Sequence, residues 1–105
     1  MNQVKLLQLA NGKCPYEEWT DSLSKDNQVR VDAYVKRVAR GGGKKNVKPL
    51  SNGIFEVKVP VGPGFRIYFG EKENLFIILL LGGDKSSQKR DIEKAKEYWR
   101  QYNEN

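Results

Sequence analysis

Apolar and polar residues alternate in two neighbouring stretches in the middle of the chain, as they do in strands with one buried face. The alternation runs over residues 54–61 and returns over residues 65–70, after a glycine- and proline-rich turn at residues 62–64. The next run, residues 75–81, is apolar throughout, which is typical of an interior strand covered on both sides. This pattern predicts three consecutive strands.

Three other stretches repeat their apolar residues at spacings of three and four, the period of an amphipathic helix. They predict helices over residues 15–24, 27–40 and about 87–102. Pro15 suits a first helical turn because an amide hydrogen would have no partner there, and we expect Asp26 to cap the second helix. The second helix is expected to bury one face and to present a basic one.

A short apolar stretch at residues 3–9 predicts a strand ahead of the helices, and the glycines and proline of residues 42–52 predict a loop. The element order is then β-α-α-β-β-β-α, an α+β fold with a small, mainly antiparallel sheet. Residues 1–105 have the size of one domain, and no linker divides them.

The composition excludes several kinds of chemistry. Cys14 is the one cysteine and the chain has no histidine, so neither an internal disulfide nor a catalytic Cys–His pair can form. We expect no metal site and no cofactor. The longest apolar run is far shorter than the ~20 residues that span a bilayer, so we expect a cytoplasmic protein that does not bind membranes.

The net charge of +6 is concentrated in residues 25–50, here called the basic segment, whose eight Lys and Arg and two Asp account for the whole excess. Such a local field attracts phosphate backbones, which favours RNA as a ligand, although a solvated lysine-rich surface is the plainer interpretation. The side chains predicted to contact RNA or the ribosome are Arg30, Lys36, Arg37, Arg40, Lys44, Lys45 and Lys48.

A second cationic group is predicted on the polar face of the two alternating strands. Lys58 and Arg66 lie on adjacent strands, Tyr68 follows Arg66 on the same face, and Lys85 comes directly after the third strand. This set is suited to a phosphate-binding cleft in which Tyr68 stacks on a base. The alternative is an ordinary solvated sheet face on which Glu56 pairs with Lys58 or Arg66.

Several motifs of the chain resemble those of a known family, over about residues 19–102. They are GIFEVKV at 53–59, GPGFRIYF at 62–69, ILLLGGDKSSQ at 78–88, DIEKA at 91–95, and Trp99. The chain resembles the RelE/ParE superfamily of bacterial toxins, and within it the HigB-like subgroup described as addiction module killer proteins.

The resemblance implies a RelE-like α+β fold and the toxin of a type II toxin–antitoxin system. Many such toxins cut messenger RNA on the ribosome without a metal, by attack of a ribose 2′-hydroxyl on the adjacent phosphate. An antitoxin encoded beside the toxin neutralises it, often through a helix-turn-helix protein, and the complex binds operator DNA. We therefore expect an mRNA endonuclease that inhibits translation and whose partners are an antitoxin, the ribosome and mRNA.

The family pattern maps its catalytic cations onto Lys58, Arg66 and Lys85. Arg66 and Lys85 are expected to stabilise charge on the phosphorus, and Lys58 is the candidate base. The tyrosine that RelE-type members carry early in the last helix is absent from residues 88–91, and the histidines of related HigB toxins are absent too. Tyr68 and Asp84 are the candidates for a supporting role in proton transfer.

Two alternatives to the nuclease remain at this stage. ParE-type relatives share the fold but inhibit DNA gyrase by binding, without cleavage chemistry. A degenerate toxin would bind only its antitoxin. Lys58, Arg66 and Lys85 favour the nuclease, because the ParE type lacks a catalytic cationic set on this sheet face.

Overall fold

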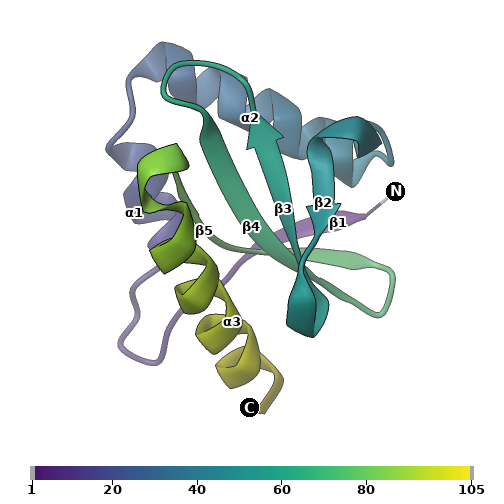
Figure 1. Cartoon of the computed structure of the whole chain (residues 1–105). Coiled ribbons are helices and arrows are strands. Elements are labelled where there is room, and N and C mark those ends of the chain that lie inside the picture. The colour runs from purple at the N-terminus through teal and green to yellow at the C-terminus, as the bar shows by residue number, and fades with distance from the viewer. Residues whose placement is uncertain (1, 105) are drawn as a thin grey trace.

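The computed structural model describes residues 2–104 as a five-stranded sheet with helices on both faces (Figure 1). The strand order is β1-β5-β4-β3-β2. The elements, in chain order, are β1 (Gln3–Leu6), α1 (Pro15–Asp21), α2 (Lys25–Ala39), β2 (Val47–Pro49), β3 (Ile54–Val59), β4 (Phe65–Lys72), β5 (Phe76–Gly83) and α3 (Gln88–Glu104).

The central strand β4 pairs antiparallel with both β3 and β5, and β1 pairs with β5 in parallel. The predicted α+β class, the mainly antiparallel sheet and the interior position of the apolar third strand are thus confirmed, and the fold is compatible with a RelE-like one. Within residues 2–104, no helix is both long and apolar enough to cross a bilayer.

The stretch predicted as a loop, residues 42–52, contains the edge strand β2, so that prediction is wrong in part. Val47 and Lys48 pair with Val57 and Glu56 of β3, and a short 3-10 turn, Lys44–Asn46, precedes them. A strand of this length leaves almost no periodicity in a sequence. Pro49 also argued against a strand, because proline has no amide hydrogen to donate to a neighbouring strand. Proline is nevertheless tolerated on an edge strand, where no neighbour on the open side requires that hydrogen.

The helix boundaries differ from the predicted ones at their caps. Ser24, and not Asp26, caps α2, because its side chain accepts a hydrogen bond from the Asn27 amide. Helix α1 ends at Asp21, where the hydroxyl of Ser22 turns back to donate to the Trp19 carbonyl at 2.6 Å. A 3-10 turn over Lys85–Ser87 precedes α3, which therefore starts at Gln88.

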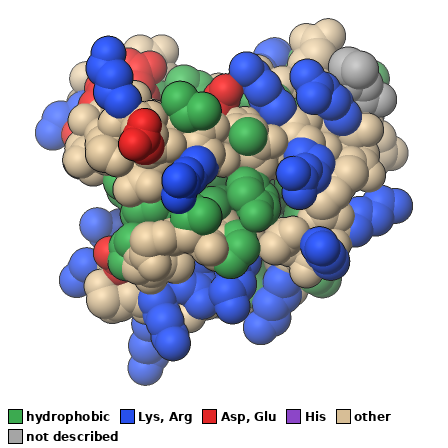
Figure 2. Space-filling model, turned by 90° about the horizontal axis from the view of Figure 1, so that it is seen from above, with side chains coloured by type: hydrophobic (Ala, Val, Ile, Leu, Met, Phe, Trp, Pro, Cys, Tyr) green, Lys and Arg blue, Asp and Glu red, His purple; other side chains and the backbone are tan. Residues whose placement is uncertain are grey.

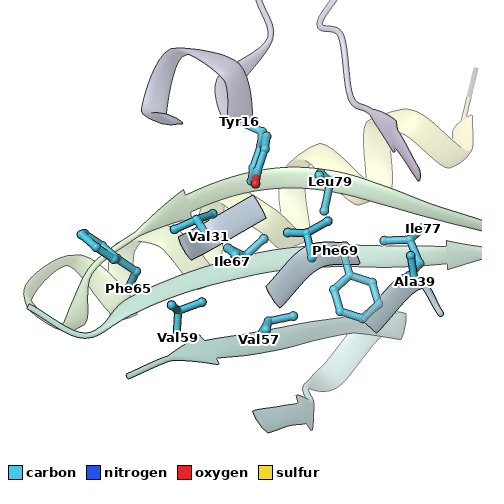
Figure 3. Close-up of a cluster of buried hydrophobic side chains, with 11 residues drawn as sticks. Tyr16, Val31, Ala39, Val57, Val59, Phe65, Ile67, Phe69, Ile77 and Leu79 are labelled. Atoms are coloured by element: carbon cyan, nitrogen blue, oxygen red, sulfur yellow. The ribbon is translucent and has the colours of Figure 1, made fainter. Parts of the chain in front are cut away.

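Two apolar cores lie on opposite faces of the sheet. The larger one joins α1 and α2 to β3, β4 and β5, with Tyr16, Val31 and Ile67 pointing into one cluster (Figure 3). The second lies under α3, where Ala95 and Trp99 pack on Ile54, Leu80 and other strand residues. Helix α3 therefore covers the sheet face on which the sequence predicted an open cationic cleft.

Candidate functional site

Strand register brings the first two predicted site residues together. Lys58 of β3 lies directly opposite Arg66 of β4, and Arg66 in turn lies opposite Gly83 at the end of β5. Side chains of directly opposed residues share a sheet face, with Cβ atoms about 5 Å apart. Both cations therefore leave the sheet on the α3 side, at the end of β5.

Lys85 lies at the same end of the sheet, in the 3-10 turn that links β5 to α3. A Cβ atom placed on Gly64 would be 3.7 Å from Nη1 of Arg66 and 3.9 Å from Cβ of Lys85, so the two residues flank the same turn glycine. The structure thus gathers Lys58, Arg66 and Lys85 around one end of the β3–β4 hairpin.

The three cations differ in accessibility. Lys58 and Lys85 are exposed, whereas Arg66 is only 7% exposed. Nη1 of Arg66 donates to the Gly64 carbonyl at 3.1 Å, and Nε lies 3.9 Å from Oε2 of Glu56 without a hydrogen-bond partner in the described residues. The guanidinium is therefore held by the protein.

Glu56 is the residue that holds this arrangement, and it is itself buried, at 5% exposed. Its Oε2 accepts a hydrogen bond from Nε2 of Gln88 at 2.9 Å, which ties the sheet to the first turn of α3. The Glu56–Arg66 pair considered from the sequence is thus present. Gln88, which sequence reasoning did not single out, completes the bridge, and no pattern in the sequence signalled its role.

Tyr68 is fully buried, at 0% exposed, and lies directly opposite Glu56 in the sheet. A ring without exposed surface cannot stack on a base, so the base-stacking interpretation of Tyr68 is wrong in this structure. Burial, together with the nearby carboxylates of Glu56 and Asp91, raises the pKa of the Tyr68 phenol above its usual range. Its hydroxyl has no hydrogen-bond partner among residues 2–104.

Asp84 shapes the turn that carries Lys85. Its Oδ1 accepts hydrogen bonds from the hydroxyl of Ser86 at 2.6 Å and from the Ser86 amide at 2.8 Å. These hydrogen bonds lower the pKa of the Asp84 carboxyl, and the charge of Arg66 adds to the effect. Asp84 is therefore ionised at neutral pH and unsuited to donating a proton.

The seven cations predicted to bind RNA or the ribosome are all exposed. Lys36 pairs with Asp32 at 2.9 Å, and the Arg37 guanidinium lies 5.2 Å from the centre of the Tyr34 ring. Seen from above, the molecule presents Lys and Arg side chains around a hollowed apolar centre (Figure 2). The predicted basic surface is thus exposed, but nothing in its geometry specifies a ligand.

One of the seven, Lys48, belongs to the cationic group at the sheet. It lies opposite Glu56 on β2, so its side chain leaves the sheet on the same face as Lys58 and Arg66. The cations of α2 lie on a helix that packs on the other face. The basic segment is therefore divided between two sides of the molecule, which a count of charges along the chain cannot reveal.

The mixed sheet and the three helices form a small α+β fold that is compatible with the RelE-like class. Residues 18–100 match the family described as phage-derived protein Gp49-like (DUF891), and the chain belongs to this family. The family is RelE-like and associated with toxin–antitoxin modules. An uncharacterized protein of Haemophilus influenzae is 34% identical over 82 residues, covering 77% of this chain and 82% of its own length.

Proposed function

We propose that this protein is the toxin of a type II toxin–antitoxin module and cuts ribosome-bound messenger RNA. Membership of a toxin-associated, RelE-like family supports the toxin class. The observation that carries the nuclease is the strand register that sets Lys58 opposite Arg66, with Lys85 beside the same hairpin end. We also propose that the toxin belongs to the HigB-like subgroup, which the resemblance to addiction module killer proteins supports.

In the proposed reaction, the 2′-oxygen of one nucleotide attacks the phosphorus that follows it. A new P–O2′ bond forms as the P–O5′ bond breaks, which leaves a 2′,3′-cyclic phosphate and a 5′-hydroxyl. Arg66 and Lys85 stabilise the charge that develops on the phosphoryl oxygens, and Lys58 is the candidate base for the 2′-hydroxyl proton. The leaving 5′-oxygen takes a proton from solvent.

To bind the phosphate, Arg66 must give up part of its interactions with Gly64 and Glu56. Its hydrogen bond to Gly64 has an uncharged carbonyl as acceptor, and its pairing with the Glu56 carboxylate is long at 3.9 Å. A phosphate can offer the guanidinium two charge-assisted hydrogen bonds. Glu56 and Gln88 then act as positioning residues for Arg66. Lys58 and Lys85, whose side chains are exposed to solvent, contact the substrate directly.

The burial of Arg66 also supports a second candidate, a toxin that acts by binding alone. If the guanidinium serves only to join β3, β4 and α3, only Lys58 and Lys85 remain of the three predicted catalytic cations. Gyrase inhibition of the ParE type, and binding restricted to the antitoxin, both belong to this candidate.

The experiment that separates the two is a cleavage assay with programmed ribosomes, run beside a gyrase supercoiling assay. The wild-type protein should cut mRNA only when it is ribosome-bound and should leave 2′,3′-cyclic phosphate ends. Arg66→Ala should slow cutting by about 10²–10³-fold, the effect of removing one preorganised charge donor. Intact mRNA with inhibited gyrase would establish the binding candidate instead.

The partners follow from the same proposal: a cognate antitoxin encoded beside the toxin, the ribosome with its mRNA, and operator DNA through the antitoxin complex.

The exposed cations of α2 are assigned to ribosomal RNA. Arg30→Glu with Arg37→Glu should weaken ribosome binding at least ~10-fold and reduce its salt dependence, because phosphate contacts release counterions. Lys5→Glu with Lys13→Glu makes the same change of charge elsewhere and should have a smaller effect; equal effects would contradict the assignment.

A further inference from the structure

Glu56 lies beside two polar side chains of β4 that share its sheet face. Tyr68 is directly opposite Glu56 in the strand register, and Arg66 is the preceding residue of β4 on the same face. All three are more than nine-tenths buried, with Tyr68 at 0%, Glu56 at 5% and Arg66 at 7% exposed. The Glu56 carboxylate therefore depends on protein groups, more than on solvent, for its hydrogen bonds.

Two buried polar atoms in this group have no hydrogen-bond partner among residues 2–104. They are Nε of Arg66 and the hydroxyl of Tyr68. The guanidinium has other interactions, with the Gly64 carbonyl and, at longer range, with Glu56. The phenol has a single polar atom, and that atom is unpaired. Because buried polar groups are nearly always paired in native proteins, the Tyr68 hydroxyl is an exception that needs an explanation.

Binding of a phosphate by Arg66 would change the surroundings of Glu56. Among the described residues, the carboxylate accepts a side-chain hydrogen bond from Nε2 of Gln88 at 2.9 Å, and its cationic partner is Arg66 at 3.9 Å. When the guanidinium turns toward a phosphate, Glu56 keeps the amide donor and loses the cation. A charge left buried without its partner is strongly destabilising. The release of Arg66 is therefore easier if a second donor replaces it.

The Tyr68 hydroxyl is placed to be that donor. Its ring packs in the second core with Ile54 and Leu80, on the strand next to Glu56. Burial, with the nearby Glu56 carboxylate adding to it, raises the pKa of the phenol above its usual range. The hydroxyl consequently keeps its proton at neutral pH and is able to donate it in a hydrogen bond.

Two neighbouring groups are less suited to these roles. Lys48 of β2 is also opposite Glu56, but it is exposed and forms no ion pair with Glu56 in the described part of the chain. Asp91 is a second carboxylate near Tyr68, but it already accepts a hydrogen bond from the Ser87 hydroxyl at 2.5 Å. Glu56 is the carboxylate whose cationic partner is engaged at long range.

We propose that Tyr68 is a positioning residue whose hydroxyl replaces Arg66 as a donor to Glu56 when the guanidinium binds the scissile phosphate. The phenol keeps its proton, and no covalent bond changes. Glu56 and Gln88 stay in place, and Arg66 engages the phosphate without leaving a buried charge unpaired. The role in cleavage rests on the proposed function, whereas the exchange of donors at Glu56 does not.

Urea unfolding at neutral pH in two backgrounds tests the exchange of donors. In the wild-type protein, Tyr68→Phe should change the equilibrium constant of unfolding less than ~3-fold, because the hydroxyl has no partner there. In an Arg66→Met background, Tyr68→Phe should raise that constant at least ~10-fold, about 1.4 kcal/mol, as loss of a hydrogen bond to a charged group does. Equal effects in the two backgrounds would overturn the proposal.

A Gln88→Met background gives a second comparison, which applies even if Arg66→Met does not fold. It removes the amide donor to Glu56 and keeps the charge pair, so Tyr68→Phe should again cost at least ~10-fold. Ser87→Ala is the matched control, because it removes the donor to Asp91 instead. A cost that grows in the Ser87→Ala background and not in the Gln88→Met background would assign the hydroxyl to Asp91 and refute the proposal.

Lys48→Met tests the other replacement for Arg66. Its effect on unfolding should be the same in the wild-type and Arg66→Met backgrounds, because the Lys48 ammonium stays solvated in both. If the cost of Lys48→Met grows in the Arg66→Met background and that of Tyr68→Phe does not, Lys48 is the replacement and the proposal is wrong.

Single-turnover cleavage on programmed ribosomes tests the role in the reaction. Tyr68→Phe should lower the maximal rate at least ~10-fold and leave unchanged the toxin concentration that gives half of it, because docking depends on other side chains. Tyr16→Phe, a buried tyrosine in the core on the opposite sheet face, should cut at the wild-type rate. A wild-type maximal rate for Tyr68→Phe would refute the positioning role.

Failure of the nuclease and failure of the donor exchange give different results. If the wild-type protein leaves ribosome-bound mRNA intact but the effect of Tyr68→Phe on unfolding depends on Arg66, the nuclease is refuted and the exchange of donors stands. If the mRNA is cut and the unfolding effects of Tyr68→Phe and Arg66→Met are additive, the nuclease stands and the exchange of donors is wrong.

Discussion

At the scale of single residues, Arg66 links the stability of the protein to its proposed activity. Its guanidinium lies in a nearly closed site between the Gly64 carbonyl and the Glu56 carboxylate. A buried charge is costly without a partner, so Arg66 depends on Glu56. The same burial fixes the direction of the guanidinium toward the hairpin end, where Lys85 also lies.

Glu56→Leu should therefore destabilise the fold by about 3–5 kcal/mol, because it leaves the Arg66 charge buried without its carboxylate. The double variant Glu56→Leu with Arg66→Met removes both charges and should recover most of that loss. Urea unfolding measures both. Asp32→Ala breaks the exposed pair with Lys36 and serves as the control, with an expected cost below ~1 kcal/mol. A Glu56→Leu protein as stable as this control would show that the buried pair contributes little.

The buried phenol groups of Tyr68 and Tyr16 should make the protein less stable in alkali. Burial raises the pKa values of Tyr68 and Tyr16 above the usual range, so above a pH of about 10 the unfolded chain loses phenol protons that the folded chain keeps. The free energy of unfolding should then fall with rising pH, by up to ~1.4 kcal/mol per pH unit for each tyrosine. Below that pH, neither group makes stability depend on pH.

Tyr68→Phe should remove its share of this slope and cost little at neutral pH, because its hydroxyl has no hydrogen-bond partner in the described residues. Urea unfolding between pH 8 and ~11 gives the slope. Tyr34→Phe, a half-buried tyrosine of α2, is the control for the substitution itself. The same alkaline slope in wild type and Tyr68→Phe would contradict this interpretation.

The sequence predicted which residues share a face more reliably than it predicted what covers that face. Alternation alone placed Lys58, Arg66 and Tyr68 on one side of two strands, and the register agrees. It did not predict that α3 buries Tyr68 and most of Arg66, because the periodicity of a strand does not indicate which helix packs on which face of the sheet. The bridge from Gln88 to Glu56 depends on that packing and was equally invisible.

At the scale of elements, close contacts between helices and strands require glycine at particular strand positions. A Cβ atom on Gly70 of β4 would lie 2.6 Å from three atoms of the Trp99 ring, which also stacks on Tyr102. The ring is rigid and buried, so it cannot move aside easily. Helix α3 therefore reaches the sheet only because β4 has no side chain at this point.

Gly70→Ala should destabilise the protein by about 1–3 kcal/mol through overpacking against Trp99. Gly42→Ala is the matched control, because its nearest neighbour is the flexible Arg37 side chain, with Cγ at 3.1 Å. Thermal unfolding of the two variants compares them directly. Equal midpoints for Gly70→Ala and the wild type would mean that α3 is not seated on β4 as described.

The central elements were predictable and the edges were not. Strands β3, β4 and β5 and the three helices have long periodic patterns, whereas β2 has three residues, one of them proline. Residues 47–49 form a strand because they pair with β3, and this contact between distant parts of the chain leaves no local pattern in the sequence. For the same reason the sequence could not show that Lys48 joins the sheet face of Lys58 or that β5 continues past β1.

At the scale of the whole molecule, two kinds of surface lie apart. The cations at the end of the β3–β4 hairpin form the proposed catalytic group, and the exposed cations of α2 lie on the opposite side of the sheet. Membership of the Gp49-like family supports the toxin class that the motifs suggested. The net charge of +6 thus serves two proposed roles, one in catalysis and one in docking on RNA.

The most direct test of the proposed catalytic group is the single-turnover rate of mRNA cleavage on programmed ribosomes by variants of its exposed lysines. Lys58→Ala and Lys85→Ala should each slow cutting by about 10²-fold or more without unfolding the protein, because both side chains are solvated. Lys89→Ala, an exposed lysine of α3, should cut at the wild-type rate. Equal rates for all three variants, or a wild-type protein that leaves the mRNA intact, would contradict a catalytic group at this end of the sheet.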